Sequence, residues 1–299
     1  TKLYDSLVAP VIEYGASIWG TREFTCINAI HNRACRYYMG LGKYTPNLAV
    51  TGDMGWKPPT VRQWNRVFNQ WNRCLTMDPN RINKKIFNWA YTCARGNCNN
   101  WSKRIFNQSA VLNIHDFRRD IIPIFAFDKA IVDNALAHKF LEKWHSNLFD
   151  DRNGINGGNK LRTYRLFKTR YEPEHYLLSN LNFQYRSAFA KFRCGVAPLR
   201  IETGRYEHIP LELRVCLHCS YYAGVHIIES EMHVLMSCPL YEDLREELFA
   251  HARVNVPNFD SFNQQDQFCI FFKNEDIIKY SAKTCHNILS RRRRFLYNL

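Results

Sequence analysis

Cys216-Leu217-His218-Cys219 begins the stretch that decides how the carboxy-terminal half of this chain folds, and His233 and Cys238 complete it. The cysteines and His233 follow the spacing C-x2-C-x13-H-x4-C. Two cysteines separated by two residues can turn both sulfur atoms toward one point, and a histidine and a third cysteine can complete a tetrahedron around Zn²⁺. Because four protein ligands leave no open position for water, Cys216, Cys219, His233 and Cys238 predict a structural zinc site.

Two other histidines, His218 and His226, lie close to this stretch in the sequence. We favour His233 as the ligand because its spacing from Cys238 suits a short helical turn, whereas His218 would be crowded between two other ligands. The alternative is four reduced, unrelated side chains in a cysteine-rich chain. Cys93 and Cys98 bracket a second polar loop, but no further ligand pair follows them at a suitable spacing.

The composition is that of a globular chain of about two domains. It has 299 residues, of which 46% are hydrophobic and 14% aromatic. No apolar run reaches the length of about 18 residues that a membrane span needs, and the first residues do not resemble a secretory signal. The eleven cysteines are odd in number and scattered, which favours reduced thiols. We therefore expect an intracellular protein without a membrane partner.

The formal net charge of +14 is distributed unevenly. Positive charge is concentrated in residues 1–110 and 160–210, and residues 211–260 are acidic. A basic field of this size attracts polyanions, so RNA or DNA is the first partner to consider. An acidic protein partner, or solubility alone, is the alternative explanation.

Apolar residues recur at helical spacing through most of the chain, which predicts a mainly α fold. Leu3, Leu7, Val11, Tyr14 and Trp19 mark two short helices or one kinked helix. A helix over 61–75 carries an apolar stripe and a basic face, and in the segment after it Ile82, Ile86 and Trp89 are expected to face inward. Further helices are expected over 130–148 and 277–289, around 185–192, and around 241–249 with an acidic face.

The polar, glycine-rich run between residues 150 and 159 is the best linker in the chain. It divides a basic helical domain, residues 1–150, from a second part, residues 160–299, with the linker at 151–159. The second part begins with a basic helix that carries aromatic side chains. The predicted contacts with nucleic-acid backbone are Arg62, Arg66, Arg73, Lys84, Lys85, Lys160, Arg162, Arg165 and Lys168.

Four consecutive arginines, Arg291 to Arg294, lie near the end of the chain. Such a run is typical of either a solvated tail or a nuclear-import signal. The second interpretation places the protein in the nucleus as well as the cytoplasm.

Two separated parts of the sequence resemble one family, the LINE-type (non-long-terminal-repeat) retrotransposon reverse transcriptases. The first part resembles the segment that follows the polymerase palm, and the second resembles the carboxy-terminal cysteine-histidine module. The motifs of the first part are Leu3-Tyr4 to Ile18-Trp19-Gly20, Asn32-Arg33-Ala34-Cys35-Arg36, Met39-Gly40-Leu41, Gly52-Asp53-Met54-Gly55-Trp56 and Arg81-Ile82-Asn83-Lys84. Those of the second are Phe192-Arg193-Cys194-Gly195, Glu202-Thr203-Gly204-Arg205-Tyr206 and the zinc stretch to Cys238-Pro239-Leu240-Tyr241.

This resemblance implies that residues 1 to about 95 form a thumb-like helical domain that grips a template–primer duplex. It implies that the CCHC zinc module helps to position RNA or target DNA, in a ribonucleoprotein with an upstream polymerase domain on the same chain. Polymerisation needs clustered carboxylates for two Mg²⁺ ions, and the family's aromatic-x-Asp-Asp hairpin is missing from this sequence. We therefore expect a fragment with no catalytic residues, whose parent polyprotein is an RNA-directed DNA polymerase. The alternative is a zinc-stabilised protein-interaction module without nucleic-acid activity.

Overall fold

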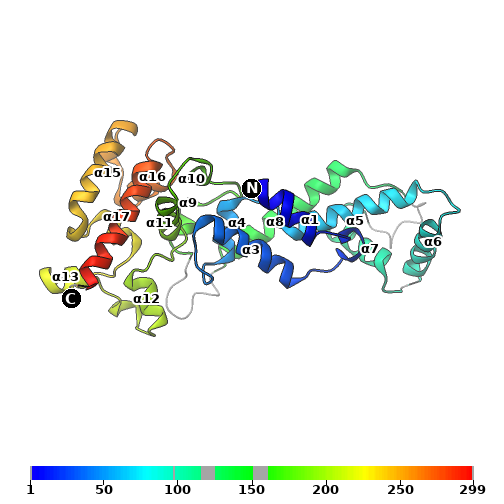
Figure 1. The fold of residues 1–299 in the computed structure, drawn as a ribbon, viewed down its shortest axis with the longest axis horizontal. Coiled ribbons are helices and arrows are strands. Elements are labelled where there is room, and N and C mark those ends of the chain that lie inside the picture. The colour runs from blue at the N-terminus through cyan, green and yellow to red at the C-terminus, as the bar shows by residue number, and fades with distance from the viewer. Residues whose placement is uncertain (1, 97, 116–124, 151–160, 298–299) are drawn as a thin grey trace. The chain divides into compact units, whose positions relative to one another are not determined.

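The computed structural model describes residues 2–96, 98–115, 125–150 and 161–297, and every regular element in these ranges is a helix (Figure 1). A single antiparallel bridge, between Val215 and Ile228, is the one strand-type pairing within them. The prediction of a mainly α fold is therefore confirmed. None of the described helices combines the length and the hydropathy that crossing a bilayer requires.

The helices have the following bounds in chain order. They are η1 (a π-helix, Tyr4–Val8), α1 (Ala9–Ile12), α2 (Ala16–Trp19), α3 (Thr25–Met39), α4 (Asn47–Met54), α5 (Pro59–Leu75), α6 (Ile82–Arg95), α7 (Trp101–Val111), α8 (Lys129–Leu148), α9 (Tyr164–Phe167), α10 (His175–Leu178), α11 (Phe183–Arg193), α12 (Arg200–Tyr206), η3 (Leu211–Leu213), α13 (Leu217–Ala223), α14 (Glu231–Met236), η4 (Pro239–Tyr241), α15 (Glu242–Asn255), η5 (Phe259–Ser261), α16 (Gln264–Lys273) and α17 (Ile278–Tyr297).

The chain forms two compact units, and neither is a single continuous segment. Unit 1 comprises residues 1–31 and 57–145, and unit 2 comprises residues 32–56 and 146–299. The boundaries fall inside α3 and α8. The sequence placed residues 32–56 in the amino-terminal domain, whereas in the structure they pack within unit 2. The predicted linker, residues 151–159, lies outside the described residues.

The core of unit 1 is built around Trp71 of α5, whose side chain is fully buried. Phe87 of α6 meets the Trp71 ring edge-on at 4.9 Å, and Trp101 of α7 stacks on it at 6.1 Å between ring centroids. The indole N–H donates to the carbonyl of Phe125 at 3.1 Å, so its polar atom is satisfied. The apolar stripe predicted for residues 61–75 therefore does face the core.

Helix α6 is turned differently from the prediction. Phe87 and Tyr91 are buried, whereas Ile82, Ile86 and Trp89 are 72%, 55% and 66% exposed. The expectation that these three face inward was therefore wrong. Both sets have helical spacing, and Phe87 and Tyr91 are the set that can pack against the Trp71 ring.

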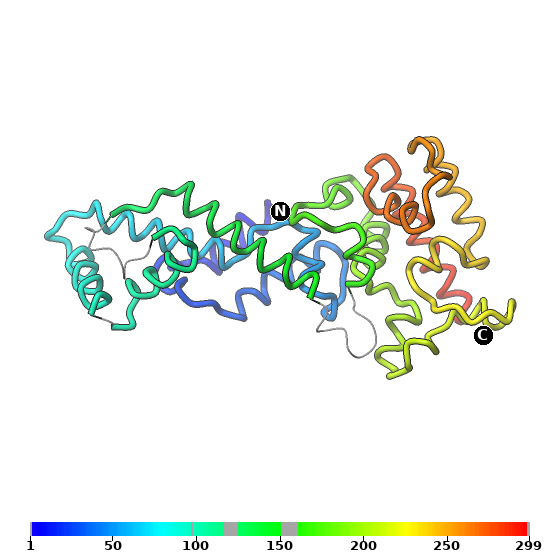
Figure 2. The backbone as a smooth tube through the Cα atoms, turned by 180° about the vertical axis from the view of Figure 1, so that it is seen from behind, coloured from blue at the N-terminus to red at the C-terminus, as the bar shows by residue number. Residues whose placement is uncertain are grey.

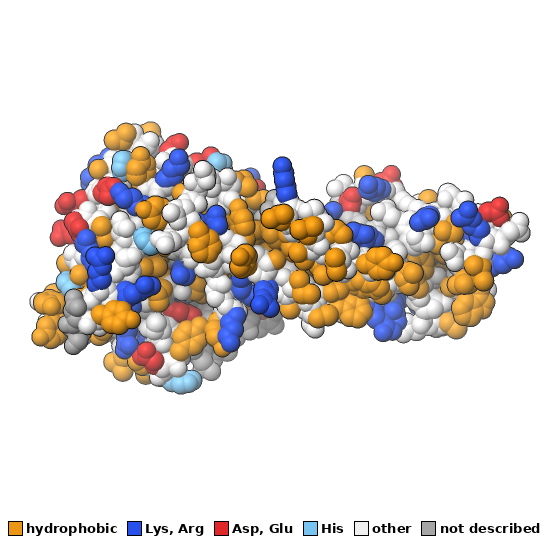
Figure 3. All heavy atoms as spheres, in the orientation of Figure 1, with side chains coloured by type: hydrophobic (Ala, Val, Ile, Leu, Met, Phe, Trp, Pro, Cys, Tyr) orange, Lys and Arg blue, Asp and Glu red, His pale blue; other side chains and the backbone are white. Residues whose placement is uncertain are grey.

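A second exposed apolar face runs along the first helices of unit 1. Leu3, Leu7, Val11, Tyr14 and Ile18 share one side of η1, α1 and α2, and each is more than 60% exposed. Hydrophobic side chains gather over these helices in the space-filling view (Figure 3). The predicted helical spacing is correct, but the stripe faces outward.

Unit 2 is organised around a buried ion pair between Asp53 of α4 and Arg193 of α11. The guanidinium donates to both carboxylate oxygens of Asp53, at 2.9 and 3.1 Å, and both side chains are almost completely buried. Tyr164 and Tyr176 donate their hydroxyls to the same carboxylate at 3.0 and 2.9 Å. Burial alone would raise the pKa of Asp53, but the charge and hydrogen bonds of Arg193 outweigh it and hold the pKa below its usual value.

Further bonds tie the same segment to the carboxy-terminal half of the chain. The backbone N–H of Glu174 donates to the Asp53 carbonyl at 2.9 Å. Gly55 adopts a left-handed conformation, with φ of +59°, beside Pro173, where an added Cβ would lie 2.3 Å from the proline nitrogen. The hydroxyl of Ser187 donates to the Gly40 carbonyl at 2.7 Å. Residues 32–56 therefore belong to unit 2 because their backbone is bonded to it at several points.

The four-arginine run forms the last turns of α17 rather than a solvated tail. Arg291 is paired with Asp243, and Arg292 is buried and donates to both oxygens of Glu229 at 2.8 and 2.7 Å. Arg293 and Arg294 are exposed. The end of α17 lies beside α13 when unit 2 is seen from opposite sides (Figures 1 and 2).

We expect Asp53→Ala to lower the free energy of unfolding of unit 2 by about 3 kcal/mol, because it removes the carboxylate that accepts two hydrogen bonds from the buried Arg193 guanidinium and leaves only Glu174, 3.0 Å away, to pair with it. Asp260→Ala is the matched control, since Asp260 and its partner Arg253 are both more than half exposed. The control should cost less than about 1 kcal/mol. Urea unfolding followed by circular dichroism measures both, and equal small losses would contradict the role of the buried pair.

Candidate metal centre

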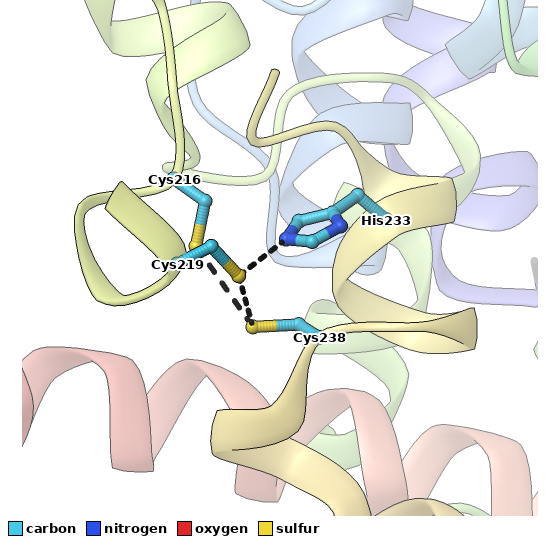
Figure 4. A group of neighbouring side chains, drawn as sticks. All are labelled: Cys216, Cys219, His233 and Cys238. Carbon is cyan, nitrogen blue, oxygen red and sulfur yellow. Dashed lines mark hydrogen bonds between the residues drawn. The ribbon is translucent and has the colours of Figure 1, made fainter. Parts of the chain in front are cut away.

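The side chains of Cys216, Cys219, His233 and Cys238 converge on one point inside unit 2 (Figure 4). Their ligand atoms all lie within 4.8 Å of one another, and all four residues are buried. The sequence therefore predicted this group correctly. Within the described ranges, it is the one set of three or more cysteine, histidine or carboxylate side chains close enough to share an ion.

The distances fit a tetrahedral ion. The Sγ atom of Cys238 lies 3.8 Å from that of Cys216 and 3.9 Å from that of Cys219, and the Cys219 Sγ lies 3.4 Å from Nε2 of His233. An ion with Zn–S bonds of about 2.3 Å and a Zn–N bond of about 2.0–2.1 Å sets its ligands about 3.8 Å apart for two sulfurs and about 3.5 Å apart for sulfur and nitrogen. The side chains present could thus hold such an ion with little rearrangement.

A short antiparallel pairing positions the first two cysteines. Val215 pairs with Ile228, and the backbone N–H of Cys216 donates to the Ile227 carbonyl at 2.7 Å. The chain then enters α13 with Cys216 as its N-cap residue, and Gly224 ends the helix at φ +64°. This one bridge fixes where the Cys216-x2-Cys219 turn begins.

Helix α14 positions the other two ligands. Its N-cap residue, Ser230, accepts a hydrogen bond from the His233 backbone N–H at 3.2 Å. The helix ends at Met236, and the backbone N–H of Cys238 then donates to the His233 carbonyl at 2.9 Å. The x4 spacing between histidine and cysteine therefore returns the cysteine to the same end of the helix as the histidine.

Ser237 selects the form of the His233 ring that suits a ligand. Its hydroxyl donates to the His233 carbonyl at 3.3 Å, and the same oxygen lies 3.2 Å from Nδ1 of the His233 ring. Because the hydroxyl proton is already used, the oxygen accepts from Nδ1–H, and Nε2 is left with its lone pair toward the sulfurs. Such a partner orients a metal-bound histidine and raises its basicity.

The two alternative histidines point elsewhere. The ring of His218 packs against Tyr222 and Phe295, with centroids 4.9 and 5.6 Å away. His226 is exposed, and its Nδ1 lies 3.2 Å from the Ser220 hydroxyl. The choice of His233 is therefore confirmed by the geometry.

The three thiols compete for negative charge when no cation lies between them. The hydrogen bond with Cys238 lowers the pKa of the Cys216 thiol to about 3, whereas the same bond, together with burial, raises the pKa of Cys238 far above its usual value. Burial also raises the pKa of Cys219. A dication would relieve this competition, because it stabilises several thiolates at once.

Two buried glutamates beside the site connect it to other parts of unit 2. Glu231, in the first turn of α14, accepts two hydrogen bonds from Arg162 at 2.9 Å and one from the Thr163 hydroxyl at 3.3 Å. Glu229 accepts from Arg292 and, at 2.6 Å, from the backbone N–H of Arg200. Sequence reasoning missed both, because their partners lie far away along the chain and nothing in the local pattern indicates them.

The predicted basic contacts of unit 1 fall into two groups. Arg66 pairs with the buried Glu13 at 2.7 Å, and Arg62 lies 3.6 Å from the same carboxylate and 3.2 Å from Asp5. Lys84 donates to the carbonyls of Cys74 and Leu75 and so caps the end of α5. Arg73 and Lys85 are exposed, and Arg66 is exposed as well despite its bond to Glu13.

In unit 2, most of the basic residues that were predicted to contact nucleic acid bond instead to groups of the protein itself. Arg162 holds Glu231, and Arg165 donates to the Leu148 carbonyl at 2.6 Å. Lys168 is almost completely buried, and its ammonium pairs with Glu174. Lys160 lies outside the described residues. The structure therefore gives Lys168 a partner in the interior instead of a position on a binding surface.

Comparison with known proteins identifies no relative of this chain. No protein-family model matches the chain, and no curated protein or solved structure is significantly similar to it.

We expect the purified protein to carry one metal ion per chain and Cys219→Ser to lose it, because three ligands hold a dication much less tightly than four. Elemental mass spectrometry measures the ratio of metal to protein. Hydrogen exchange should show faster opening of residues 210–250 in the variant, since metal binding contributes folding free energy.

Two matched variants test the specificity of that loss. Cys26→Ser removes an exposed cysteine, and His226→Ala removes the neighbouring exposed histidine. Both should retain the ion, whereas His233→Ala should lose it. Unchanged metal content in Cys219→Ser and His233→Ala would mean that the four side chains converge without binding an ion.

Proposed function

We propose that this chain is a non-catalytic, nucleic-acid-binding part of a LINE-type reverse transcriptase, in which Zn²⁺ bound by the Cys3His group braces the carboxy-terminal module. Its partners are RNA, DNA or both, together with a polymerase domain upstream on the same chain. The proposal includes a ribonucleoprotein setting in the nucleus and cytoplasm.

The observation that carries the nucleic-acid part of this proposal is the excess of exposed positive charge on unit 1. From residue 54 to residue 115 the chain contains many cations and one carboxylate, Asp78. Arg73, Arg81 and Lys85 are exposed at the junction of α5 and α6. Exposed cations such as these attract phosphates and release bound counterions on contact.

The ligand set favours zinc over other metals. Three thiolates and one imidazole in a closed tetrahedral arrangement suit Zn²⁺, whereas Mg²⁺ and Ca²⁺ prefer oxygen ligands. With no position left for water or substrate, the ion would act on the fold and not on a reaction.

The link to reverse transcriptases rests on the resemblance of the motifs, and one structural fact supports it. Asp53 lies in the Gly52–Trp56 motif and Arg193 in the Phe192–Gly195 motif, and these two residues form the buried ion pair of unit 2. Two motifs far apart in sequence thus serve a single interaction.

A second candidate function is a zinc-stabilised module that binds a protein. The exposed apolar face of η1, α1 and α2 favours it, because contiguous apolar surface on soluble proteins often marks an interaction site. This candidate predicts weak nucleic-acid binding that changes little with salt.

We expect the affinity for a generic duplex to fall steeply between about 50 and 200 mM salt, by about 3.5-fold for each phosphate that is neutralised. Arg73→Gln combined with Lys85→Gln should weaken binding and reduce the slope of log K against log salt by up to about 2. Fluorescence anisotropy with a labelled duplex measures both quantities.

The charge-matched control is Arg253→Gln combined with Lys283→Gln, since these side chains already pair with Asp260 and Glu247. The control should bind the duplex as the unmodified protein does. A salt-independent affinity, or equal effects of the two double variants, would contradict phosphate binding through α5 and α6.

A further inference from the structure

An aromatic surface lies next to the metal centre in unit 2. It consists of His218, Tyr221 and Tyr222 of α13 and Phe295 of α17. Tyr221 and Tyr222 are 75% and 65% exposed, and their ring centroids are 4.9 Å apart. Phe295 lies 5.6 Å from the His218 ring and 6.4 Å from the Tyr222 ring. Figure 3 shows hydrophobic side chains, the class that includes tyrosine, on the surface at α13.

The aromatic surface is held in place from two sides. Cys219 lies within α13, one turn before Tyr222, so a metal ion would anchor that helix. On the other side, Arg292 is bonded to Glu229 three residues before Phe295. Rings fixed in this way lose little conformational freedom when a partner binds.

Two exposed arginines, Arg293 and Arg294, directly precede Phe295 of the aromatic surface in the sequence, and two carboxylates of unit 2 close to α17 are already paired. Residues 213–228 contain no aspartate or glutamate. Glu229 is bonded to Arg292, and Asp243 to Arg291, whereas Arg293 and Arg294 are exposed.

Exposed aromatic rings with exposed arginines next to them in the sequence suit a partner that offers both planar bases and phosphates. Duplex nucleic acid presents its phosphates but keeps its bases stacked inside, so it could use only the arginines. Single strands can place their bases on exposed rings, and each stacked base adds affinity with little dependence on sequence. A purely apolar protein partner would gain nothing from the charge of Arg293 and Arg294.

We propose that the aromatic surface, with Arg293 and Arg294, binds unpaired nucleotides of single-stranded RNA or DNA. This inference rests on the proposed function of the chain as a nucleic-acid-binding protein. It goes further by separating two surfaces, since the cations of α5 and α6 contact backbone, and α13 with the end of α17 contacts bases.

The test compares single-strand and duplex binding of the full zinc-loaded chain at fixed salt. The probes are a labelled 20-nucleotide oligo-dT, the equivalent oligo-U and the oligo-dT annealed to its complement. Tyr221→Ala combined with Tyr222→Ala should weaken binding of both single strands by about fivefold or more, because two stacking positions are lost. Binding of the duplex should change by less than twofold.

Three controls distinguish the loss of base stacking from unrelated effects of the substitutions. Tyr221→Phe combined with Tyr222→Phe keeps the rings and should retain single-strand affinity. Tyr37→Ala removes a tyrosine that is 86% exposed on α3 and should have no effect. Metal content and far-UV circular dichroism of each variant exclude a loss of folding.

Unchanged single-strand affinity in the folded alanine variant would overturn this inference while leaving salt-dependent duplex binding, and hence the proposed function, intact. Failure of the unmodified chain to bind any probe would overturn both. If the alanine variant weakens duplex and single strands equally, the surface does not contact bases and the inference also fails.

Discussion

The buried contact between Asp53 and Arg193 is the constraint on which unit 2 depends. A charged pair removed from water is tolerated only when its members satisfy each other and their remaining hydrogen bonds are filled. Here Tyr164, Tyr176 and the carbonyl of Phe272 fill them. Because the partners lie on α4 and α11, the pair holds a segment from the first quarter of the chain against the carboxy-terminal half.

This constraint explains which parts of the structure could be predicted from the sequence. Helical spacing is local, so the helices over 59–75, 129–148 and 183–193 were expected close to their observed bounds. The Cys3His group was also predictable, because metal geometry limits its ligands to a few spacings. The placement of residues 32–56 was not, because it depends on a pairing across 140 residues.

The roles of the basic residues were also difficult to predict from the sequence. A basic residue in a sequence can serve a partner molecule or a carboxylate of its own chain, and the local pattern is identical in both cases. Arg162 and Lys168 looked like neighbours on a basic helix, yet one holds Glu231 beside the metal ligands and the other is buried against Glu174. Helix α9 itself is only four residues long, so the expected basic face does not extend along a continuous helix. The face of α6 was misassigned for a related reason, since only the position of Trp71 decides which of its two apolar stripes is covered.

The Cys3His group also bears on how the segment around it can be stabilised. Between residues 213 and 228 most apolar side chains are exposed, so this segment buries too little surface to stabilise its own fold. A metal ion bound by four ligands can supply several kcal/mol of folding free energy, on the scale of that known for small zinc modules. An ion in the Cys3His group, together with the bond between Arg292 and Glu229, would hold the segment without a contribution of Tyr221 and Tyr222 to a core. A segment stabilised in this way could leave its largest rings on the surface.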